Sequence, residues 1–356
     1  MQRPVMQPTF SADDITPKKK KAPKWQSFFK NNVLSFLKWC VKSLLSNPVK
    51  LKRRAEVTDK PPLVSRLIRG LAYRALFLPV LVALSSATLV FTGTHPNTAY
   101  SATDPATYGV YHEPVMIESA DGTRLEGWVS PVVSARSILE HGNKILRTKH
   151  PAVVLVHDFG RPPQTMLPLF QPFHDDGIVV IAVGLRGANS SSMQTAGQTF
   201  GLKEAMDVQA AVNELRSRPF VDATRIAVVG VGSGANATVL AAARDPQIKA
   251  TILIDPYRDP DAVIRQHIGP ERVGLRWMQP LCKWTFELGY RVDAEEMEID
   301  RFPEVTKSRP SLMLESNGEA EFMTRPETVN QMREFLRRHL RAERGSNSSG
   351  YQTRFK

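Results

Sequence analysis

Cysteine is scarce in this sequence of 356 residues. Cys40 and Cys282 are the two cysteines, and an uncharged apolar run at residues 75–92 lies between them. Because the two thiols flank such a run, we expect no structural disulfide between them. The sequence also lacks a CxxC pair and the Cys/His spacings of zinc sites, so it predicts neither a metal site nor a cofactor.

Acidic residues are sparse in the N-terminal part. Residues 1–74 hold 17 Lys and Arg against 4 Asp and Glu, a balance of +13, so the remainder of this +12 chain carries −1. A basic segment of this kind suits nucleic acid or an anionic membrane surface. The apolar run that follows favours the membrane. We therefore expect residues 18–54 to face anionic lipid and expect no nucleic-acid partner.

The basic segment divides into two parts. Residues 1–24 are polar and contain the lysine run 18–21, which is typical of a disordered arm. Within residues 25–46, apolar and aromatic residues recur at helical spacing, and Lys38 and Lys42 fall on the opposite sector. This pattern predicts a basic amphipathic helix lying in a bilayer interface. A helix packed on protein is the alternative.

The uncharged run 75–92 is about 18 residues long, just enough to cross a bilayer at about 1.5 Å per residue. Flanking apolar residues extend it, so we predict a transmembrane helix over residues 71–93. Arginines crowd its N-terminal side, whereas the first charge after it is Asp104. The positive-inside rule then gives a single-pass cell-membrane protein with a cytoplasmic N-terminus and an extracytoplasmic C-terminal domain.

Two other interpretations of the run stay open. A cleaved signal peptide could end near Ala99-Tyr100-Ser101, although some 70 preceding residues are too many for an ordinary n-region. A buried helix of a soluble domain is the second.

Residues 94–110 read as a polar linker, and residues 111–340 read as an α/β domain. Short apolar strand patterns alternate with helical patterns, which predicts a mostly parallel sheet with helices on both faces. The expected strands are 115–119, 125–129, 152–157, 178–183, 226–229, 250–254 and 312–315, and the expected helices are 202–217, 235–243 and 326–340. Residues 258–309 break the alternation and predict a helical cap, and residues 341–356 predict a flexible tail.

Four local strings follow one another in this domain. They are Glu113-Pro114-Val115 with Asp121-Gly122-Thr123-Arg124-Leu125, then Leu155-Val156-His157-Asp158-Phe159-Gly160, then Leu185-Arg186-Gly187, and then Arg225-Ile226-Ala227-Val228-Val229-Gly230-Val231-Gly232-Ser233-Gly234. Their order and spacing resemble the α/β-hydrolase superfamily, particularly its dienelactone hydrolase and S9 peptidase-like branch. The resemblance runs from about residue 110 to 325. It implies an α/β-hydrolase fold with a nucleophile elbow at the fourth string, and fold alone does not imply activity.

The elbow of that family reads Gly-x-Ser-x-Gly, with small residues on both sides of the nucleophile. If Gly230 and Gly234 are the flanking glycines, the nucleophile position is Gly232, which has no nucleophile. Ser233 then begins the next helix, and we expect its hydroxyl to cap that helix. The alternative places the nucleophile at Ser233, with a branched valine in a crowded flanking position. We favour the first register.

The resemblance places the acid at Glu321, where Glu replaces Asp, and places the base after the acid. A serine nucleophile needs a base within hydrogen-bonding reach. Beyond Glu321 the sequence offers only His339, inside an Arg-rich helical segment, whereas His267 falls in the cap and His157 in the oxyanion string. None of the three matches the position of the base.

The oxyanion string departs from the family as well, since His-Gly-x-Gly has become His157-Asp158-Phe159-Gly160. The amide of Phe159 could still donate, but Asp158 places a carboxylate where negative charge should develop. The sequence therefore favours a binding or scaffolding role, with a ligand or protein partner at the pocket under the cap. The alternatives are a serine hydrolase that uses Ser233 and a membrane- or partner-binding module carried by the basic arm.

Overall fold

The protein is described here from a computed structural model, which covers residues 63–96, 98, 103–132, 148–188, 197–316 and 321–341. The predicted arm 1–24, the predicted amphipathic helix 25–46 and nearly all of the predicted tail lie outside the described residues. The chain divides into two compact units, residues 1–81 and 82–356.

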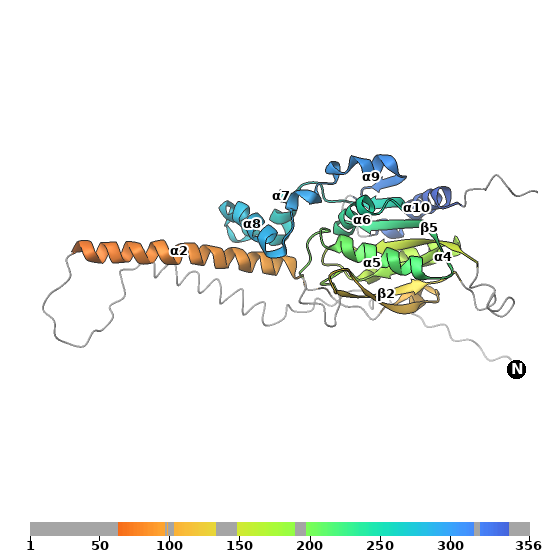
Figure 1. Cartoon of the computed structure of the whole chain (residues 1–356), viewed down its shortest axis with the longest axis horizontal. Helices are drawn as coiled ribbons and strands as arrows, with labels where there is room; N and C mark the ends of the chain where they lie inside the picture. Colours follow the sequence, from red (N-terminus) through yellow and green to blue (C-terminus); the bar gives the residue numbers. More distant parts are fainter. Residues whose placement is uncertain are drawn as a thin grey trace, which may run out of the picture. The chain divides into compact units, whose positions relative to one another are not determined.

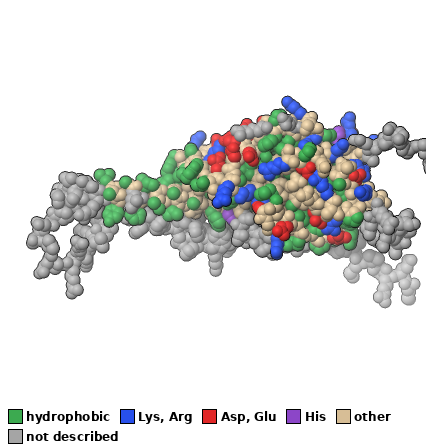
Figure 2. Space-filling model, in the orientation of Figure 1, with side chains coloured by type: hydrophobic (Ala, Val, Ile, Leu, Met, Phe, Trp, Pro, Cys, Tyr) green, Lys and Arg blue, Asp and Glu red, His purple; other side chains and the backbone are tan. Residues whose placement is uncertain are grey.

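Helix α2 (Leu63–Thr94) is one continuous helix of 32 residues with Pro79 inside it. Its part Gly70–Thr94 is 25 residues long and, by length and composition, apolar enough to cross a membrane. Large apolar side chains such as Leu71, Phe77 and Leu84 are exposed along it, and Figure 2 shows this apolar surface. The predicted helix is confirmed and begins eight residues earlier, while its membrane crossing stays a prediction.

A sheet forms the centre of the described domain, with helices packed on it (Figure 1). It has seven strands in the order β1-β2-β4-β3-β5-β6-β7. The strands are β1 (Glu113–Glu118), β2 (Arg124–Ser130), β3 (His150–Val156), β4 (Val179–Val183), β5 (Val221–Val231), β6 (Ile248–Ile254) and β7 (Ser311–Leu314). β1 and β2 form an antiparallel hairpin, and β2 also pairs antiparallel with β4. All pairs among β3, β4, β5, β6 and β7 are parallel, as predicted.

Helices cover both faces of this sheet, which confirms the predicted layering. On one face lie α5 (Glu204–Ser217) and α6 (Ser233–Arg244), and on the other lie η4 (Pro163–Leu169), α4 (Phe170–Asp175) and α10 (Pro326–His339). Alternate residues of a strand point to opposite faces. Accordingly, Val154 packs in the cluster with α5 and α6, whereas Leu155 packs in the cluster with α4 and α10. Both clusters consist of buried residues, so the domain has an apolar core on each side of the sheet.

The helical cap lies between β6 and β7, where it was predicted. It consists of α7 (Pro260–Val263), the π-helix η5 (Ile264–Ile268), η6 (Pro270–Val273), η7 (Arg276–Met278), α8 (Gln279–Tyr290), η8 (Ala294–Met297), η9 (Ile299–Arg301) and α9 (Pro303–Ser308). Its buried residues, including Ile264, Cys282 and Phe286, form a third apolar cluster with Phe200 and Val90.

Val90 belongs to the C-terminal part of α2, so residues 82–94 share a core with the cap. Two hydrogen bonds join them: Ser86 Oγ lies 2.8 Å from Thr285 Oγ1, and Thr94 Oγ1 lies 2.6 Å from the hydroxyl of Tyr290. The segment that follows α2 also folds in part. The short helix η2 (Pro105–Tyr108) lies in it and Val110 is buried in the core. The predicted linker 94–110 is therefore partly packed onto the domain.

Candidate functional site

A sharp turn joins β5 to α6 at Gly232. Its φ of 53° and ψ of −119° lie in a left-handed region that favours glycine. The two flanking glycines have no room for a side chain. A Cβ at Gly230 would lie 2.3 Å from the carbonyl oxygen of Gly234, and a Cβ at Gly234 would lie 2.5 Å from the carbonyl oxygen of His157. This strand–turn–helix arrangement is the structural context of a nucleophile elbow, with glycine at its apex.

Asp158 lies against the apex of this turn. Its Oδ1 accepts hydrogen bonds from the backbone amides of Phe159 at 2.6 Å and of Ser233 at 2.9 Å. The hydroxyl of Tyr257 donates to the same oxygen at 3.1 Å. A Cβ built on Gly232 would lie only 1.9 Å from it. This one carboxylate oxygen therefore fills the space that an elbow side chain would take. It also accepts the hydrogen bonds of the backbone amides beside that space.

The prediction that the Ser233 hydroxyl caps α6 is wrong. Ser233 is the first residue of the helix, Gly232 holds the N-cap position, and no side chain at that position caps the helix. The free amide of Ser233 instead donates to Asp158, a residue distant in the sequence. A negative group at a helix N-terminus is favourable, so Asp158 takes the capping role expected of the serine.

The electrostatics of the cluster follow from its burial. Desolvation raises the pKa of the Asp158 carboxyl, while its hydrogen bonds to Ser233, Phe159 and Tyr257 act in the opposite direction. Burial, followed by the nearby charge of Asp158, raises the pKa of Tyr257, so its hydroxyl stays protonated and can donate. That hydroxyl also lies 3.4 Å from Nε2 of His267.

His157 holds the oxyanion string in place through hydrogen bonds to the backbone. Its side chain is fully buried, and Nε2 accepts a hydrogen bond from the amide of Leu185 at 2.9 Å. Nδ1 must then carry the proton and donates to the carbonyl oxygen of Asp158 at 2.8 Å. Burial lowers the pKa of His157 to about 4, so the ring is neutral. Both ring nitrogens serve the backbone, which gives His157 a structural role.

Of the remaining sequence-predicted residues, the structure brings His267 of the cap beside this turn, but not Glu321 or His339. Glu321 is exposed and precedes the short helix η10 (Phe322–Thr324). His339 ends α10 and stacks near Phe335, with ring centroids 4.7 Å apart. Within the described residues, no hydrogen bond or ion pair joins Glu321 or His339 to Gly232, Ser233 or Asp158.

Sequence reasoning missed the aromatic cluster that packs beside Asp158. The ring of Phe159 lies 4.6 Å from that of Phe200 and 4.6 Å from that of His267. Tyr257 completes the cluster, 5.8 Å from His267. One signal was available for Tyr257, because it follows the carboxyl end of β6, the edge of a parallel sheet where ligands usually bind. The cluster joins the oxyanion string to the cap.

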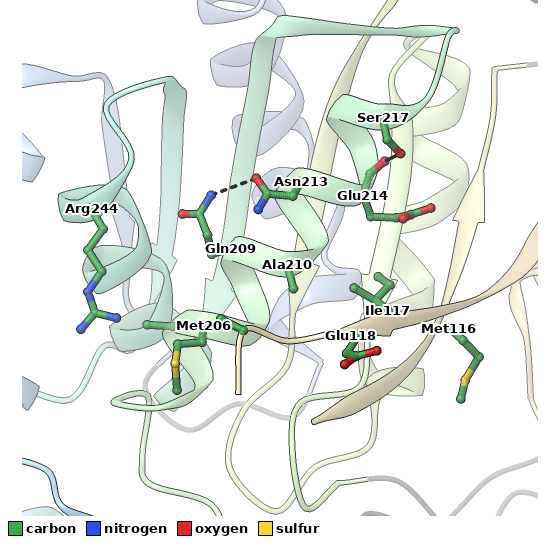
Figure 3. A pocket seen from close by; sticks show the side chains of 12 residues that line it. Met116, Ile117, Glu118, Met206, Gln209, Ala210, Asn213, Glu214, Ser217 and Arg244 are labelled. Carbon is green, nitrogen blue, oxygen red and sulfur yellow. Dashed lines mark hydrogen bonds between the residues drawn. The ribbon is translucent and has the colours of Figure 1, made fainter. Parts of the chain in front are cut away.

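A separate hollow of about 450 Å³ lies between β1, α5 and the end of α6 (Figure 3). Its lining includes Met116, Glu118, Met206, Gln209 and Arg244, and it does not include Gly232, Asp158 or Tyr257. It is therefore distinct from the candidate site. No group of three or more His, Cys, Asp and Glu within the described residues is placed to hold a metal ion.

Comparison with known proteins agrees with this fold. Residues 141–270 match the model of the "Dienelactone hydrolase family". The chain is 26% identical over 184 residues to the polyketide transferase grgF of a Penicillium species, covering 51% of this chain and 54% of that protein. It is 27% identical over 122 residues to the thiohydrolase apmlB of Arthrinium phaeospermum, covering 31% of this chain and 36% of that protein. The chain thus spans about half or less of the length of these curated relatives.

Among solved structures, an esterase of Pyrococcus furiosus superposes with a TM-score of 0.50 at 19% identity. The superposition covers 69% of this chain and 97% of the esterase. At this identity the likeness concerns the fold alone. Together with the sheet order and the elbow-like turn, these matches show an α/β-hydrolase fold, within which residues 141–270 are similar to the dienelactone hydrolase family.

Proposed function

We propose that this protein is a membrane-anchored α/β-hydrolase-fold protein that binds a ligand or a protein partner and does not hydrolyse esters or peptides. One observation carries the proposal: Oδ1 of Asp158 accepts from the amides of Phe159 and Ser233 and fills the space beside Gly232. The proposed binding region is the cap and the Tyr257–His267 side of the turn.

Three features of the turn oppose catalysis. Gly232 offers no side chain to attack a carbonyl carbon. The two amides that would stabilise an oxyanion already bind a carboxylate, and removing one such donor in a working enzyme costs about 10²–10³ in rate. Finally, His157 is committed to the backbone and Nε2 of His267 lies beside the Tyr257 hydroxyl, so we expect neither ring to act as a general base, a role that is itself worth about 10²–10⁴ in rate.

The test uses the full chain as wild type, Ser233→Ala, Gly232→Ser and Gly232→Ser with Asp158→Ala. Short-chain ester turnover and fluorophosphonate labelling are measured for each. We expect all four at the background of a heat-denatured sample, because the double variant still lacks a base. Labelling of the wild type that disappears in Ser233→Ala would refute the proposal and make the protein a serine hydrolase. Ser233 is 2% exposed and its amide is held by Asp158, which favours the non-catalytic alternative.

The membrane anchor is the second part of the proposal, and α2 supports it by its length and apolar surface. We expect the N-terminus to be cytoplasmic and the domain extracytoplasmic. Protease added to intact cells or spheroplasts should digest the domain and spare the basic arm. Release of the protein by a salt wash would contradict the anchor.

The basic segment 18–54 is proposed to bind anionic lipid. A peptide of residues 22–47 should become helical on anionic vesicles and lose binding as salt rises, since each lysine near such a surface contributes about 1 kcal/mol. Equal, salt-insensitive binding to neutral vesicles would contradict this. If residues 1–100 alone reproduce the location and the binding of the full chain, the basic arm is the active part and the domain is a passenger.

A further inference from the structure

A second groove, of about 340 Å³, lies at the amino-terminal edge of the parallel strands. Its lining includes residues at the starts of β3, β4 and β5 and at the end of α10. Gly232 follows the carboxyl end of β5, so the groove and the elbow-like turn lie at opposite edges of the sheet. The volume is within the range of small-molecule sites, about 300–1,000 Å³.

Arginines border this groove. Arg225 contributes from the start of β5, and Arg337 and Arg341 contribute from the end of α10. Lys149 lies beside them, because its carbonyl oxygen accepts a hydrogen bond from Nη2 of Arg225 at 3.2 Å. Lys149, Arg337 and Arg341 are exposed. Residues 75–356 together carry a net charge of only −1, so these four cations are a local concentration of positive charge.

Asp176 shows that this wall of the groove can bind an oxyanion. Its side chain is buried, and its Oδ2 accepts a hydrogen bond from Nε of Arg333 at 2.9 Å. Its Oδ1 forms ion pairs with both Arg333 and Arg337. Two guanidinium groups on one carboxylate leave an excess of positive charge. Guanidinium groups match carboxylate and phosphate oxygens with the same forked geometry.

The other cations of the groove are less fully balanced. Arg225 pairs with Asp222 at 2.7 Å, whereas neither Lys149 nor Arg341 has a carboxylate partner among the described residues. Basic residues in the last turn of α10 also favour the helix dipole. That effect does not account for Lys149 and Arg225, which stand at the starts of strands. The groove therefore gathers cations from separate elements.

Two histidines beside the groove respond to this charge. Burial lowers the pKa of His150, a hydrogen bond with the backbone of Gly177 raises it, and the charge of Arg225 lowers it again. Burial lowers the pKa of His339, and the charge of Arg338 lowers it further. Both rings thus lie in a positive potential, and such a potential attracts anions.

We propose that this groove binds a phosphate monoester with a small apolar group. A phosphate monoester carries a charge of about −1.5 to −2 at pH 7 and offers three acceptor oxygens, which suits several converging cations. The phosphate binds Arg225, Arg341 and Lys149. The ester group packs on the apolar part of the lining, which consists of Pro151, Ile178, Leu336 and Leu340. The site is separate from the turn at Gly232, so it does not depend on the proposed function.

The test measures which arginines a ligand shields in the detergent-solubilised full chain. Phenylglyoxal modifies accessible guanidinium groups, and peptide mass spectrometry quantifies each modified position. Phenyl phosphate is the probe, inorganic phosphate and phenol each represent one half of it, and chloride keeps the ionic strength constant. We expect phenyl phosphate to slow the modification of Arg337 and Arg341 several-fold. Inorganic phosphate should slow it less, and phenol should leave it unchanged.

Arg244 is the matched control, because it is also exposed, also ends a helix and lines the other hollow. Equal slowing at Arg244 would refute the site, since general screening of exposed arginines would then explain the result. Unchanged modification of Arg337 and Arg341 would refute it as well. Arg341→Gln should weaken the protection of Arg337 by phenyl phosphate about two- to fivefold, as for an exposed charge pair. Arg244→Gln should leave this protection unchanged, and equal effects of the two variants would contradict the assignment.

A final arm distinguishes two sources of the same chemistry. The full chain is reconstituted in phosphatidylcholine vesicles with or without phosphatidic acid, whose headgroup is a phosphate monoester, and footprinted without phenyl phosphate. Protection of Arg337 and Arg341 that requires phosphatidic acid would assign the ligand to a lipid. Protection by phenyl phosphate alone would assign it to a soluble ester.

Discussion

Replacing Gly232 by serine should destabilise the domain, and removing the Asp158 carboxylate should relieve part of that cost. A serine must adopt the left-handed φ of 53°, at a cost of about 1–3 kcal/mol. Its Cβ would also lie 1.9 Å from Oδ1 of Asp158, so the carboxylate must move, and overpacking of this kind costs about 1–3 kcal/mol. We therefore expect Gly232→Ser to lower the free energy of unfolding by about 2–6 kcal/mol.

The carboxylate accounts for the second of these costs only. Asp158→Ala alone leaves the amides of Phe159 and Ser233 without their acceptor, at about 1–3 kcal/mol each where they stay buried. In the double variant the overlap disappears, and the serine hydroxyl can accept one of the amides. The double-mutant cycle should therefore show a favourable coupling of about 1–3 kcal/mol.

The assay is urea unfolding of the detergent-solubilised full chain, followed by near-ultraviolet circular dichroism, for the wild type, both single variants and the double variant. Ser233→Ala serves as the control beside the turn. Strictly additive effects of Gly232→Ser and Asp158→Ala would refute the overlap. A Gly232→Ser variant as stable as the wild type would show that the turn is not strained in the way described.

Three further predictions concern the buried polar groups and the packing of α2. Burial lowers the pKa of His157 to about 4, so between pH 6.5 and 4 the unfolded chain binds a proton that the folded chain does not. The contribution of the neutral His157 ring to stability is therefore present above pH 6.5 and is lost as the pH falls through this window. It amounts to up to about 3 kcal/mol, and His157→Gln should remove that part of the pH dependence in unfolding experiments from pH 8 to 4. Arg186 forms ion pairs with fully buried Asp207 and with partly exposed Asp121. Arg186→Ala should cost about 3–5 kcal/mol because it leaves Asp207 buried without its partner, whereas Asp121→Asn should cost about 1 kcal/mol or less. Equal shifts of the unfolding midpoint in the two variants would contradict this difference. Gly93→Ala should increase hydrogen exchange in residues 264–290, since its Cβ meets Ile268, whereas Gly70→Ala, with open space around it, should leave exchange there unchanged.

Most of the fold could be predicted from periodicity. The Asp121-Gly122 pair between two alternating segments predicted the hairpin, and continuous apolar runs predicted the parallel strands. The ends of the strands were harder to predict. β5 begins at Val221, five residues before the predicted strand, because Val221 pairs with His150 although polar residues follow it. Backbone pairing of this kind does not depend on apolar side chains, so the hydropathy pattern did not reveal it.

The candidate site could be located from the sequence, but its geometry could not. The string around Gly232 fixed the turn between β5 and α6, and Asp158 was expected to disturb the oxyanion string. Which groups its carboxylate meets depends on Tyr257, 99 residues away, whose hydroxyl also lies 3.4 Å from Nε2 of the cap residue His267. Local patterns carry no information about such long-range contacts. For the same reason a serine cap was expected at Ser233, where a distant carboxylate serves instead.

The joint position of Gly232 and Asp158 also restricts how this sequence can change over generations. A mutation that adds a serine at the turn meets the carboxylate, and a mutation that removes the carboxylate first leaves the start of α6 uncapped. Each single step lowers stability, and natural proteins stand only about 5–15 kcal/mol above unfolding. A lineage would therefore have to pass through a less stable single variant before it reached the double variant. That double variant would still need a general base. Purifying selection on fold stability alone should keep this glycine and this aspartate together as a pair.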